Sequence, residues 1–388
     1  MTHRLPAIDF VRGLAMIIMA LDHVRDFMHE SSLSVNPTDL TNTTPALFFT
    51  RFITHLCAPI FVFLAGTSVF LNLQKTGKVT ETRKLLFKRG MWLLVLEFTL
   101  VNFAIFFDIG FHTYLFEVIA AIGFGFIVLA LLLKTPSALI GLIGILIIFG
   151  HGLFNAIPFG ENSLLQIVLN PFFNPTALSL FSGKILVIGY PPIPWLGIML
   201  AGFSVGRYFN LEASRREKLF LTIGLISLLL FVVIRSINAY GDPAAWSTQK
   251  NFLYTVLSFM NITKYPPSLI FSLFTLGVMF FLLALADRFP SSIKRVVITY
   301  GKVPLFYFVL HFYLAHGLTL LMLFVQGFTW TELEFANNRF GRPSGVDSGL
   351  PLWAIYIVWI FVVAVLYKPC LWFSRYKASH THWWLKYV

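Results

Sequence analysis

The sequence predicts an all-α polytopic membrane protein, a bundle of about ten transmembrane helices with both termini in the cytoplasm. Hydrophobic residues make up 57% of the chain and charged residues only 12%, whereas an ordinary soluble domain has about 25% charged residues. The mean hydropathy is +0.78. A soluble core cannot bury so much apolar surface, but a bilayer accepts it. We take residues 1–388 as a single transmembrane domain.

Ten apolar segments give this estimate, since each spanning helix needs about 20 mostly apolar residues. Four long connections are predicted on the outer side, at 29–49, 152–191, 240–267 and 327–350, and they either close over a polar substrate or simply cap the bundle. The predicted helices lie at about 5–28, 50–73, 87–107, 113–133, 137–151, 192–209, 219–239, 268–286, 298–325 and 351–368.

The formal net charge of +12 indicates either a polyanion-binding surface or the charge bias of a membrane topology. Lys and Arg are about four times as frequent on the predicted inner side as on the outer side, which favours a cytoplasmic N-terminus. No basic tract lies within a soluble fold, so we expect no nucleic-acid partner. We expect a multi-pass protein of the inner (plasma) membrane, surrounded by the lipid bilayer. The first helix carries Asp9 and Arg12, which argues against a cleavable signal peptide.

Ionisable groups within membrane helices are costly and indicate function. The first helix is the richest in them. Arg12 and His23 are eleven residues apart, so they share one helix face at a separation of about 16 Å. Asp26 lies one turn beyond His23 on the same face. Asp22 directly precedes His23 in the sequence. The pair of Asp9 and Arg12 has a structural alternative, an ion pair at the membrane interface.

Other helices contribute further polar groups. Arg51 and His55 form an i,i+4 pair near the outer end of the second helix, at a depth similar to that of His23. His311 is predicted near the midplane and His316 nearer the outside. The alternative for a lone buried histidine such as His311 is a hydrogen bond that only satisfies packing.

Several motifs carry a family resemblance. They are Ile8-Asp9-Phe10-Val11-Arg12-Gly13-Leu14-Ala15, Met19-Ala20-Leu21-Asp22-His23, Leu56-Cys57-Ala58-Pro59-Ile60-Phe61-Val62-Phe63-Leu64-Ala65-Gly66, Pro192-Ile193-Pro194-Trp195-Leu196-Gly197, Tyr265-Pro266-Pro267-Ser268-Leu269 and Gly301-Lys302-Val303-Pro304-Leu305-Phe306. Together they resemble the bacterial membrane family with a heparan-α-glucosaminide N-acetyltransferase-like catalytic domain, over nearly the whole chain.

The resemblance implies a transmembrane acyltransferase that moves an acyl group from cytoplasmic acyl-CoA to an extracytoplasmic acceptor, a sugar or glycan. Many glycan acyltransferases of the wider superfamily carry a basic residue about ten positions before a functional His on the first helix, and Arg12 and His23 are similar in spacing. In the lysosomal enzyme, the functional His lies in the first luminal loop and Asn stands where this chain has His23. His29 is the nearest candidate in that loop.

Physical reasoning gives these residues roles. The donor would be acetyl-CoA, with its phosphates at the inner mouth, where Arg12, Lys84, Lys88, Arg89 and Arg207 are candidates for contact; the alternative is that these charges only set topology. His23 would act as general base. Asp22 or Asp26 would orient its ring. Arg51 or His55 would stabilise the oxyanion. Acyl transfer of this kind needs no metal ion.

Two other classes of function remain open. A transporter would use the same polar residues as a proton relay, although the sequence has no paired halves with matching broken helices. A metal or haem protein would use His23, His55, His311 and His316 as ligands, although no closely spaced histidine pair supports one. A homodimer is compatible with the sequence.

Overall fold

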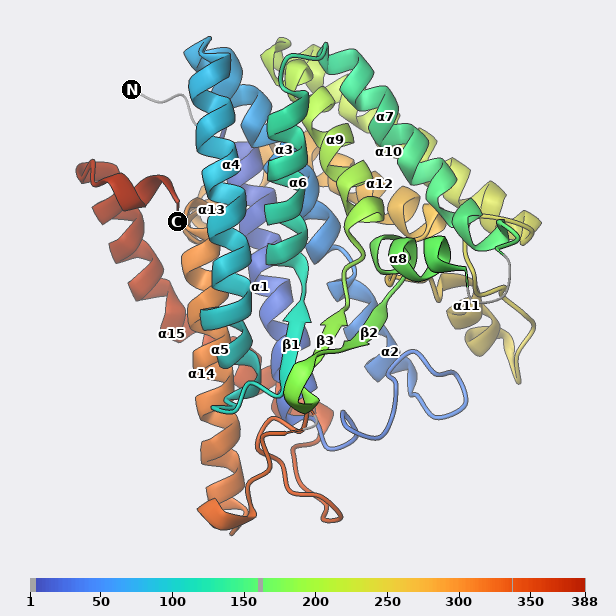
Figure 1. Cartoon of the computed structure of the whole chain (residues 1–388), viewed down its shortest axis with the longest axis vertical. Coiled ribbons are helices and arrows are strands. Elements are labelled where there is room, and N and C mark those ends of the chain that lie inside the picture. The colour runs from blue at the N-terminus through green and yellow to red at the C-terminus, as the bar shows by residue number, and fades with distance from the viewer. Residues whose placement is uncertain (1–4, 160–162, 337, 388) are drawn as a thin grey trace.

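The computed structural model describes residues 5–159, 163–336 and 338–387, and most of them are helical (Figure 1). The principal helices are α1 (Pro6–Met28), α2 (Pro45–Thr54), α3 (Cys57–Thr76), α4 (Val79–Leu96), α5 (Asn102–Phe106), α6 (Val118–Leu132), α7 (Ser137–Gly150), α8 (Leu164–Phe173), α9 (Pro192–Val205), α10 (Ala213–Ile237), α11 (Phe252–Met260), α12 (Leu269–Leu285), α13 (Ser291–Lys302), α14 (Pro304–Val325) and α15 (Leu352–Ser379). Many of the longer helices, such as α1, α4, α6 and α14, pack side by side along one direction, whereas α7 and α10 are tilted against them (Figure 1).

Within the described residues, seven helical segments are long and apolar enough to cross a membrane. Three of the predicted spans, those that correspond to α1, α6 and α9, fall outside that set. α1 carries five charged residues, whereas α6 and α9 have only 15 and 14 residues. The chain is therefore a helical membrane protein, and the count of about ten spans stays a prediction. The seven segments are Pro45–Thr76, Val79–Phe106, Ser137–Ala156, Ala213–Ile237, Leu269–Arg288, Pro304–Val325 and Leu352–Ser379.

A small sheet departs from the all-α prediction. It consists of β1 (Thr113–Phe116), β3 (Ile185–Ile188) and β2 (Thr176–Ser179), with β1 parallel and β2 antiparallel to the central β3. The predicted helix 113–133 was wrong at its start, because 113–116 pairs with β3 and α6 begins only at Val118. Aromatic and β-branched side chains favour such pairing over a helical turn.

Two predicted helices are interrupted where proline intervenes. The predicted span 50–73 divides into α2 and α3 around His55, because Pro59 lacks the N–H that would bond to the His55 carbonyl. The predicted span 298–325 divides at Val303, which has φ −134° and ψ 53°, directly before Pro304. The predicted outer loops 152–191 and 240–267 contain the short helices α8 and α11.

Glycines set the closest helix crossings. A side chain at Gly301 of α13 would place its Cβ 1.8 Å from the Asp9 carbonyl oxygen of α1, and one at Gly13 would meet the Val297 carbonyl oxygen at 1.9 Å. α1 and α13 are thus in backbone contact, as small residues permit in membrane helix pairs. This contact fixes the depth and rotation of α1, which carries Asp22, His23 and Asp26 of the site described below.

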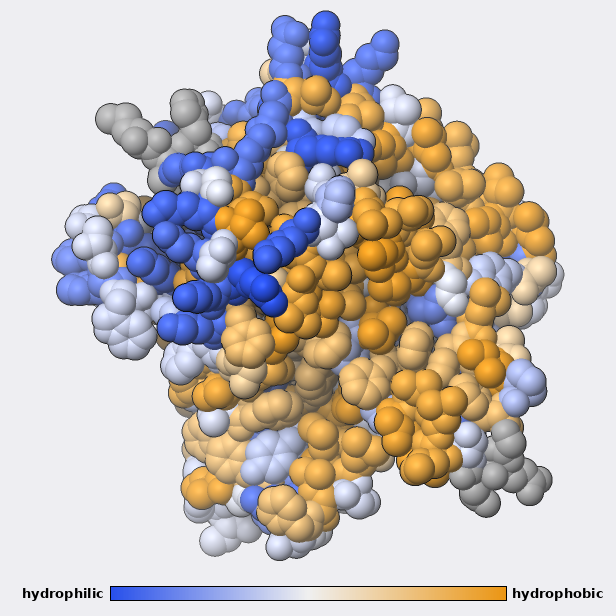
Figure 2. All heavy atoms as spheres, turned by 45° about the horizontal axis from the view of Figure 1, so that its top comes forward, coloured by the Kyte–Doolittle hydropathy of each residue, from blue (hydrophilic) through white to orange (hydrophobic). Residues whose placement is uncertain are grey.

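The two ends of the bundle differ in character. The turn between α3 and α4 lies at the top of Figure 1, and hydrophilic side chains gather at this end in Figure 2. We call it the basic end, because the exposed Lys84 and Lys88 of α4 lie there. The sheet lies at the opposite end (Figure 1), which we call the sheet end. Between them, large apolar side chains such as Leu146, Leu229 and Ile360 are more than half exposed, as expected for contact with lipid.

Candidate active site

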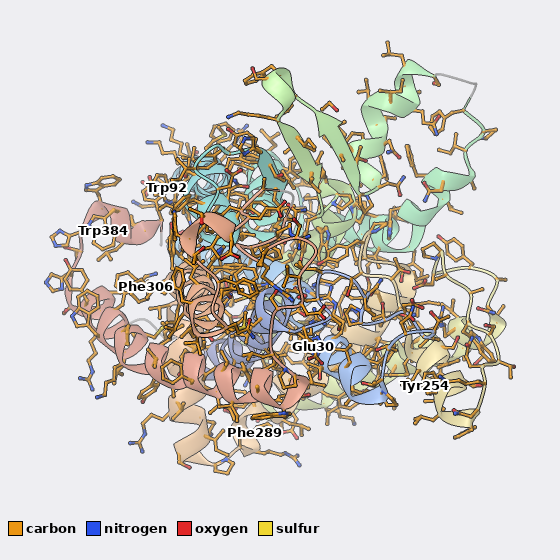
Figure 3. The ribbon with its side chains drawn as sticks, turned by 90° about the horizontal axis from the view of Figure 1, so that it is seen from below. Glu30, Trp92, Tyr254, Phe289, Phe306 and Trp384 are labelled. Atoms are coloured by element: carbon orange, nitrogen blue, oxygen red, sulfur yellow. The ribbon has the colours of Figure 1, made fainter. Side chains whose placement is uncertain are left out.

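A cavity of about 470 Å³ opens at the sheet end of the bundle. Figure 3 views this end along the bundle, with Glu30, just beyond α1, near its middle. The cavity receives side chains from α1, α2, α14 and several loops. Its polar lining residues are Asp22, His23, Asp26, Ser32, Arg51, Glu117, Tyr190, Lys264, Tyr265, Asn338 and Arg339. A smaller pocket of about 20 Å³ shares Asp22, His23, Glu117, Tyr190 and Lys264 with it and continues along α1 to Met19.

His23 lies where these two spaces meet. Its Nδ1 is 2.6 Å from Nε2 of His311, and Nδ1 of His311 is 3.2 Å from the Tyr307 carbonyl oxygen. A carbonyl only accepts, so His311 must donate from Nδ1 and accept at Nε2. His23 in turn must donate from Nδ1, which leaves the lone pair of its Nε2 without a described hydrogen-bond partner. The ring also stacks on Phe312, with centroids 4.2 Å apart. The network therefore fixes the orientation of the His23 ring, and in its neutral form Nε2 carries the free lone pair.

This arrangement corrects two predictions. His311 was predicted near the midplane and His23 near the outer surface, yet the hydrogen bond places both rings at one depth. The expectation that Asp22 or Asp26 would orient the His23 ring is also wrong. The i,i+3 spacing puts Asp26 on the correct face, but its carboxylate lies 2.5 Å from the Arg25 guanidinium, and His311 holds the ring.

Asp22 and its partners form a charge cluster beside His23. The Asp22 carboxylate is paired with Arg25 at 2.8 Å and, through its other oxygen, with Arg51. Asp22 and Arg25 are buried, at 5% and 3% exposure. Asp26 is the more open acid, with 43% of its side chain exposed. Since ion pairs compensate the charges of both arginines, the cluster fixes α2 against α1 and borders the cavity.

The remaining candidate histidines lie outside the cavity lining. His55 is 3% exposed, and its ring faces the edges of Phe52 and Phe271. His29 follows the last turn of α1, and its Nδ1 contacts Ser31; burial lowers the pKa of its imidazole. His316 is fully buried and stacks on Phe107 at 3.8 Å. Of the sequence-predicted catalytic residues, the cavity therefore brings together His23, Asp22, Asp26 and Arg51, but not His55.

The predicted donor-binding residues lie away from this cavity. Arg12 donates to the Ser68 hydroxyl of α3 at 2.9 Å and pairs with Asp9 at 3.7 Å. Arg89 lies over the Phe126 ring, 5.5 Å from its centroid. Arg207 is exposed, and its guanidinium lies 4.7 Å from the Tyr208 ring centroid. Lys84 and Lys88 are exposed on α4. Arg12 lies on α1, Lys84, Lys88 and Arg89 lie on α4, and Arg207 lies in the turn after α9.

Sequence analysis missed the residues that reach the cavity from loops. Lys264 and Tyr265 come from the loop before α12, and Tyr190 comes from the segment before α9. The motifs could have identified these residues, since Tyr265 begins one quoted motif and Tyr190 stands two residues before another. Within residues 5–159, 163–336 and 338–387, no group of three or more His, Cys, Asp or Glu side chains is arranged to hold a metal ion.

Comparison with known proteins gives the family. A search of curated proteins produced no match. Residues 4–240, more than half of the chain, match the sequence model described as heparan-alpha-glucosaminide N-acetyltransferase, catalytic. This range includes His23 and its charge cluster, whereas Lys264 and His311 lie beyond it. The chain belongs to the heparan-α-glucosaminide N-acetyltransferase catalytic-domain family.

Proposed function

We propose that this protein is a membrane-embedded acetyltransferase that moves an acetyl group from cytoplasmic acetyl-CoA to an amine or hydroxyl of an extracytoplasmic sugar or glycan. Its family indicates a membrane acetyltransferase. The observation that supports acetyl transfer at this site is the Nε2 atom of His23, which has no described hydrogen-bond partner. His23 lines a polar cavity, and His311 holds its other ring nitrogen. A base in this position removes the acceptor proton as the acceptor attacks the thioester.

The size of the two spaces supports the assignment of donor and acceptor. The pocket of about 20 Å³ beside His23 has room for a group of about the size of one water or methyl, which would admit the methyl of an acetyl group but not a long acyl chain. The cavity of about 470 Å³ is lined by carboxylates, tyrosines and cations, which suits a sugar ring with its many hydroxyls. The donor carbonyl would lie between them, beside His23.

The donor would enter from the basic end, which we place in the cytoplasm. The nucleotide phosphates cannot cross lipid, whereas a pantetheine arm is comparable in length to the roughly 16 Å that separate Arg12 from His23 along α1. Arg12, already held by Ser68, and the cations Lys84, Lys88, Arg89 and Arg207 are the proposed phosphate contacts. The acceptor would then bind at the sheet end, outside the membrane.

Removal of the base tests the proposal. The His23→Ala protein should fold and bind acetyl-CoA but lose transfer to glucosamine by about 10²–10⁴-fold, the contribution of a positioned base. Purified protein in detergent, radiolabelled acetyl-CoA and a CoA-induced thermal shift supply the measurements. His112→Ala is the matched control, because His112 lies at the sheet end with 61% of its side chain exposed. Wild-type rates in His23→Ala would exclude this base, and the absence of any CoA effect on the wild type would favour the transporter.

A further inference from the structure

Lys264 is a buried cation without a compensating anion in contact with it. It is 7% exposed and lines both the small pocket and the large cavity beside His23. Its ammonium lies 5.0 Å from the Tyr265 ring centroid and 5.8 Å from that of Tyr190. No described residue forms an ion pair or a hydrogen bond with this ammonium. Burying a charge in such surroundings costs free energy, so a lysine at this position favours a functional role.

The loop that carries Lys264 is held from both sides. The Asp242 carboxylate accepts hydrogen bonds from the Thr263 N–H at 2.9 Å, the Thr263 hydroxyl at 2.7 Å and the Ser268 hydroxyl at 2.7 Å. Arg235, only 1% exposed, donates to the carbonyls of Ser258, Phe259 and Asn261 at the end of α11. The backbone on either side of Lys264 is thus fixed before any ligand arrives. Such preorganisation is what makes a charge effective in a transition state.

The other cations of the cavity lining are already paired. Arg51 is engaged with Asp22. Arg339 lies 3.2 Å from the Glu334 carboxylate and donates to two backbone carbonyls. Among the described lining residues, Lys264 therefore offers the charge that is available to a ligand, and it lines the small pocket where the acetyl group is proposed to bind. Glu117 faces the same spaces but forms no described ion pair with Lys264.

We propose that Lys264 is a catalytic residue that stabilises the oxyanion of acyl transfer, a role that rests on the proposed function. The acceptor lone pair attacks the thioester carbon and forms the new C–N or C–O bond. The carbonyl π electrons move to oxygen, where the negative charge meets the Lys264 ammonium. The acceptor proton passes to Nε2 of His23. Collapse of the intermediate breaks the C–S bond, and the CoA thiolate takes that proton. Lys264 keeps its own protons throughout.

The test compares Lys264→Met and Lys264→Arg with the wild type, using acetyl-CoA and glucosamine in detergent. Loss of one oxyanion-stabilising group costs about 10²–10³ in kcat, so Lys264→Met should show that loss with little change in the KM for acetyl-CoA. Lys264→Arg should recover part of the rate. Lys264→Met should melt close to the wild-type temperature, because no described residue forms an ion pair or a hydrogen bond with the ammonium that is removed. Lys250→Met is the control, since Lys250 is exposed and also lies over a tyrosine ring, that of Tyr254 at 3.8 Å.

Each other outcome overturns the proposal in a different way. A raised KM with unchanged kcat would mean that Lys264 binds the ground state only. A strongly lowered melting temperature in Lys264→Met would make Lys264 a structural cation. A wild-type rate in Lys264→Met would remove its role while leaving the proposed function intact. A wild-type protein that neither binds nor turns over acetyl-CoA would refute the proposed function and the role of Lys264 with it.

Discussion

At the scale of single residues, the hydrogen-bond partner of His23 is a second imidazole, His311, and not a carboxylate. This difference affects the charge state of His23. A carboxylate partner would favour the charged imidazolium through its own charge, whereas His311 offers only a lone pair to the His23 Nδ1–H. The nearby carboxylates of Asp22 and Asp26 are already paired with arginines. His311 acts as a positioning residue, since it selects the tautomer of His23 and holds the ring against Phe312.

This role predicts a specific pattern of rescue at position 311. His311→Ala should lower kcat by about 10²-fold, because the His23 ring loses its tautomer and orientation. His311→Gln should keep most of the rate, since its side-chain amide can accept from His23 and donate to the Tyr307 carbonyl, as the imidazole does. The measurement is acetyl transfer in detergent with thermal unfolding in parallel. Equal losses in both variants, accompanied by equal loss of stability, would assign His311 a packing role only.

At the scale of elements, the segment between α4 and β1 positions the residues at the start of α6 that line the cavity. Residues Glu97–Val101 form a π-helical turn, a feature often associated with function. Glu97 is fully buried and accepts a hydrogen bond from the Ala120 N–H of α6 at 2.9 Å. Asn102 pairs with the backbone of β1, donating to the Thr113 carbonyl and accepting from the Leu115 N–H, each at 3.0 Å. These contacts fix the join between β1 and α6, where Glu117 faces the cavity.

The contact between α1 and α13 gives a prediction for stability. Gly301→Ala should destabilise the protein by about 1–3 kcal/mol, because the added Cβ must displace the α1 backbone at Asp9. The rate of acetyl transfer should fall by more than the loss of folded protein explains, since a shift of α1 also moves His23. Thermal unfolding in detergent measures the first effect and acetyl transfer the second.

Gly317→Ala on α14 is the matched control, because nothing lies within 4 Å of a Cβ built there and alanine is the better helix former. The control should be neutral or stabilising. If the melting temperature of Gly301→Ala equalled that of Gly317→Ala, the result would contradict the close approach of α1 and α13.

At the scale of the whole molecule, the charge asymmetry predicts the topology. A cysteine at Asn42, in an exposed loop of the sheet end, should react with an impermeant maleimide in intact cells, whereas one at Lys84 should react only after lysis. The two native cysteines, Cys57 and Cys370, are buried, so the background should be low. A reporter fused after Val388 should be cytoplasmic. The opposite labelling pattern would reverse the orientation.

The sequence and the structure agree most where local pattern decides. Apolar segments located the helices, and the polar face of α1 identified His23, Asp22 and Asp26 because all three lie within two helical turns. The hydrogen bond from His23 to His311 joins residues 288 positions apart, and no local spacing specifies such a contact. Lys264 was missed for a related reason. It lies in a loop, where neither helical periodicity nor hydropathy indicates which side chains turn inward.

The crossing of α1 by α13 has a consequence for how the protein is made. Charged residues are costly when a helix inserts into a membrane, and α1 carries Asp9, Arg12, Asp22, Arg25 and Asp26. Arg51 of the next helix pairs with Asp22. Gly301, His311 and Trp359, whose indole donates to the Ile17 carbonyl at 2.7 Å, belong to the last third of the chain. α1 therefore reaches its final environment only after α13, α14 and α15 have been synthesised.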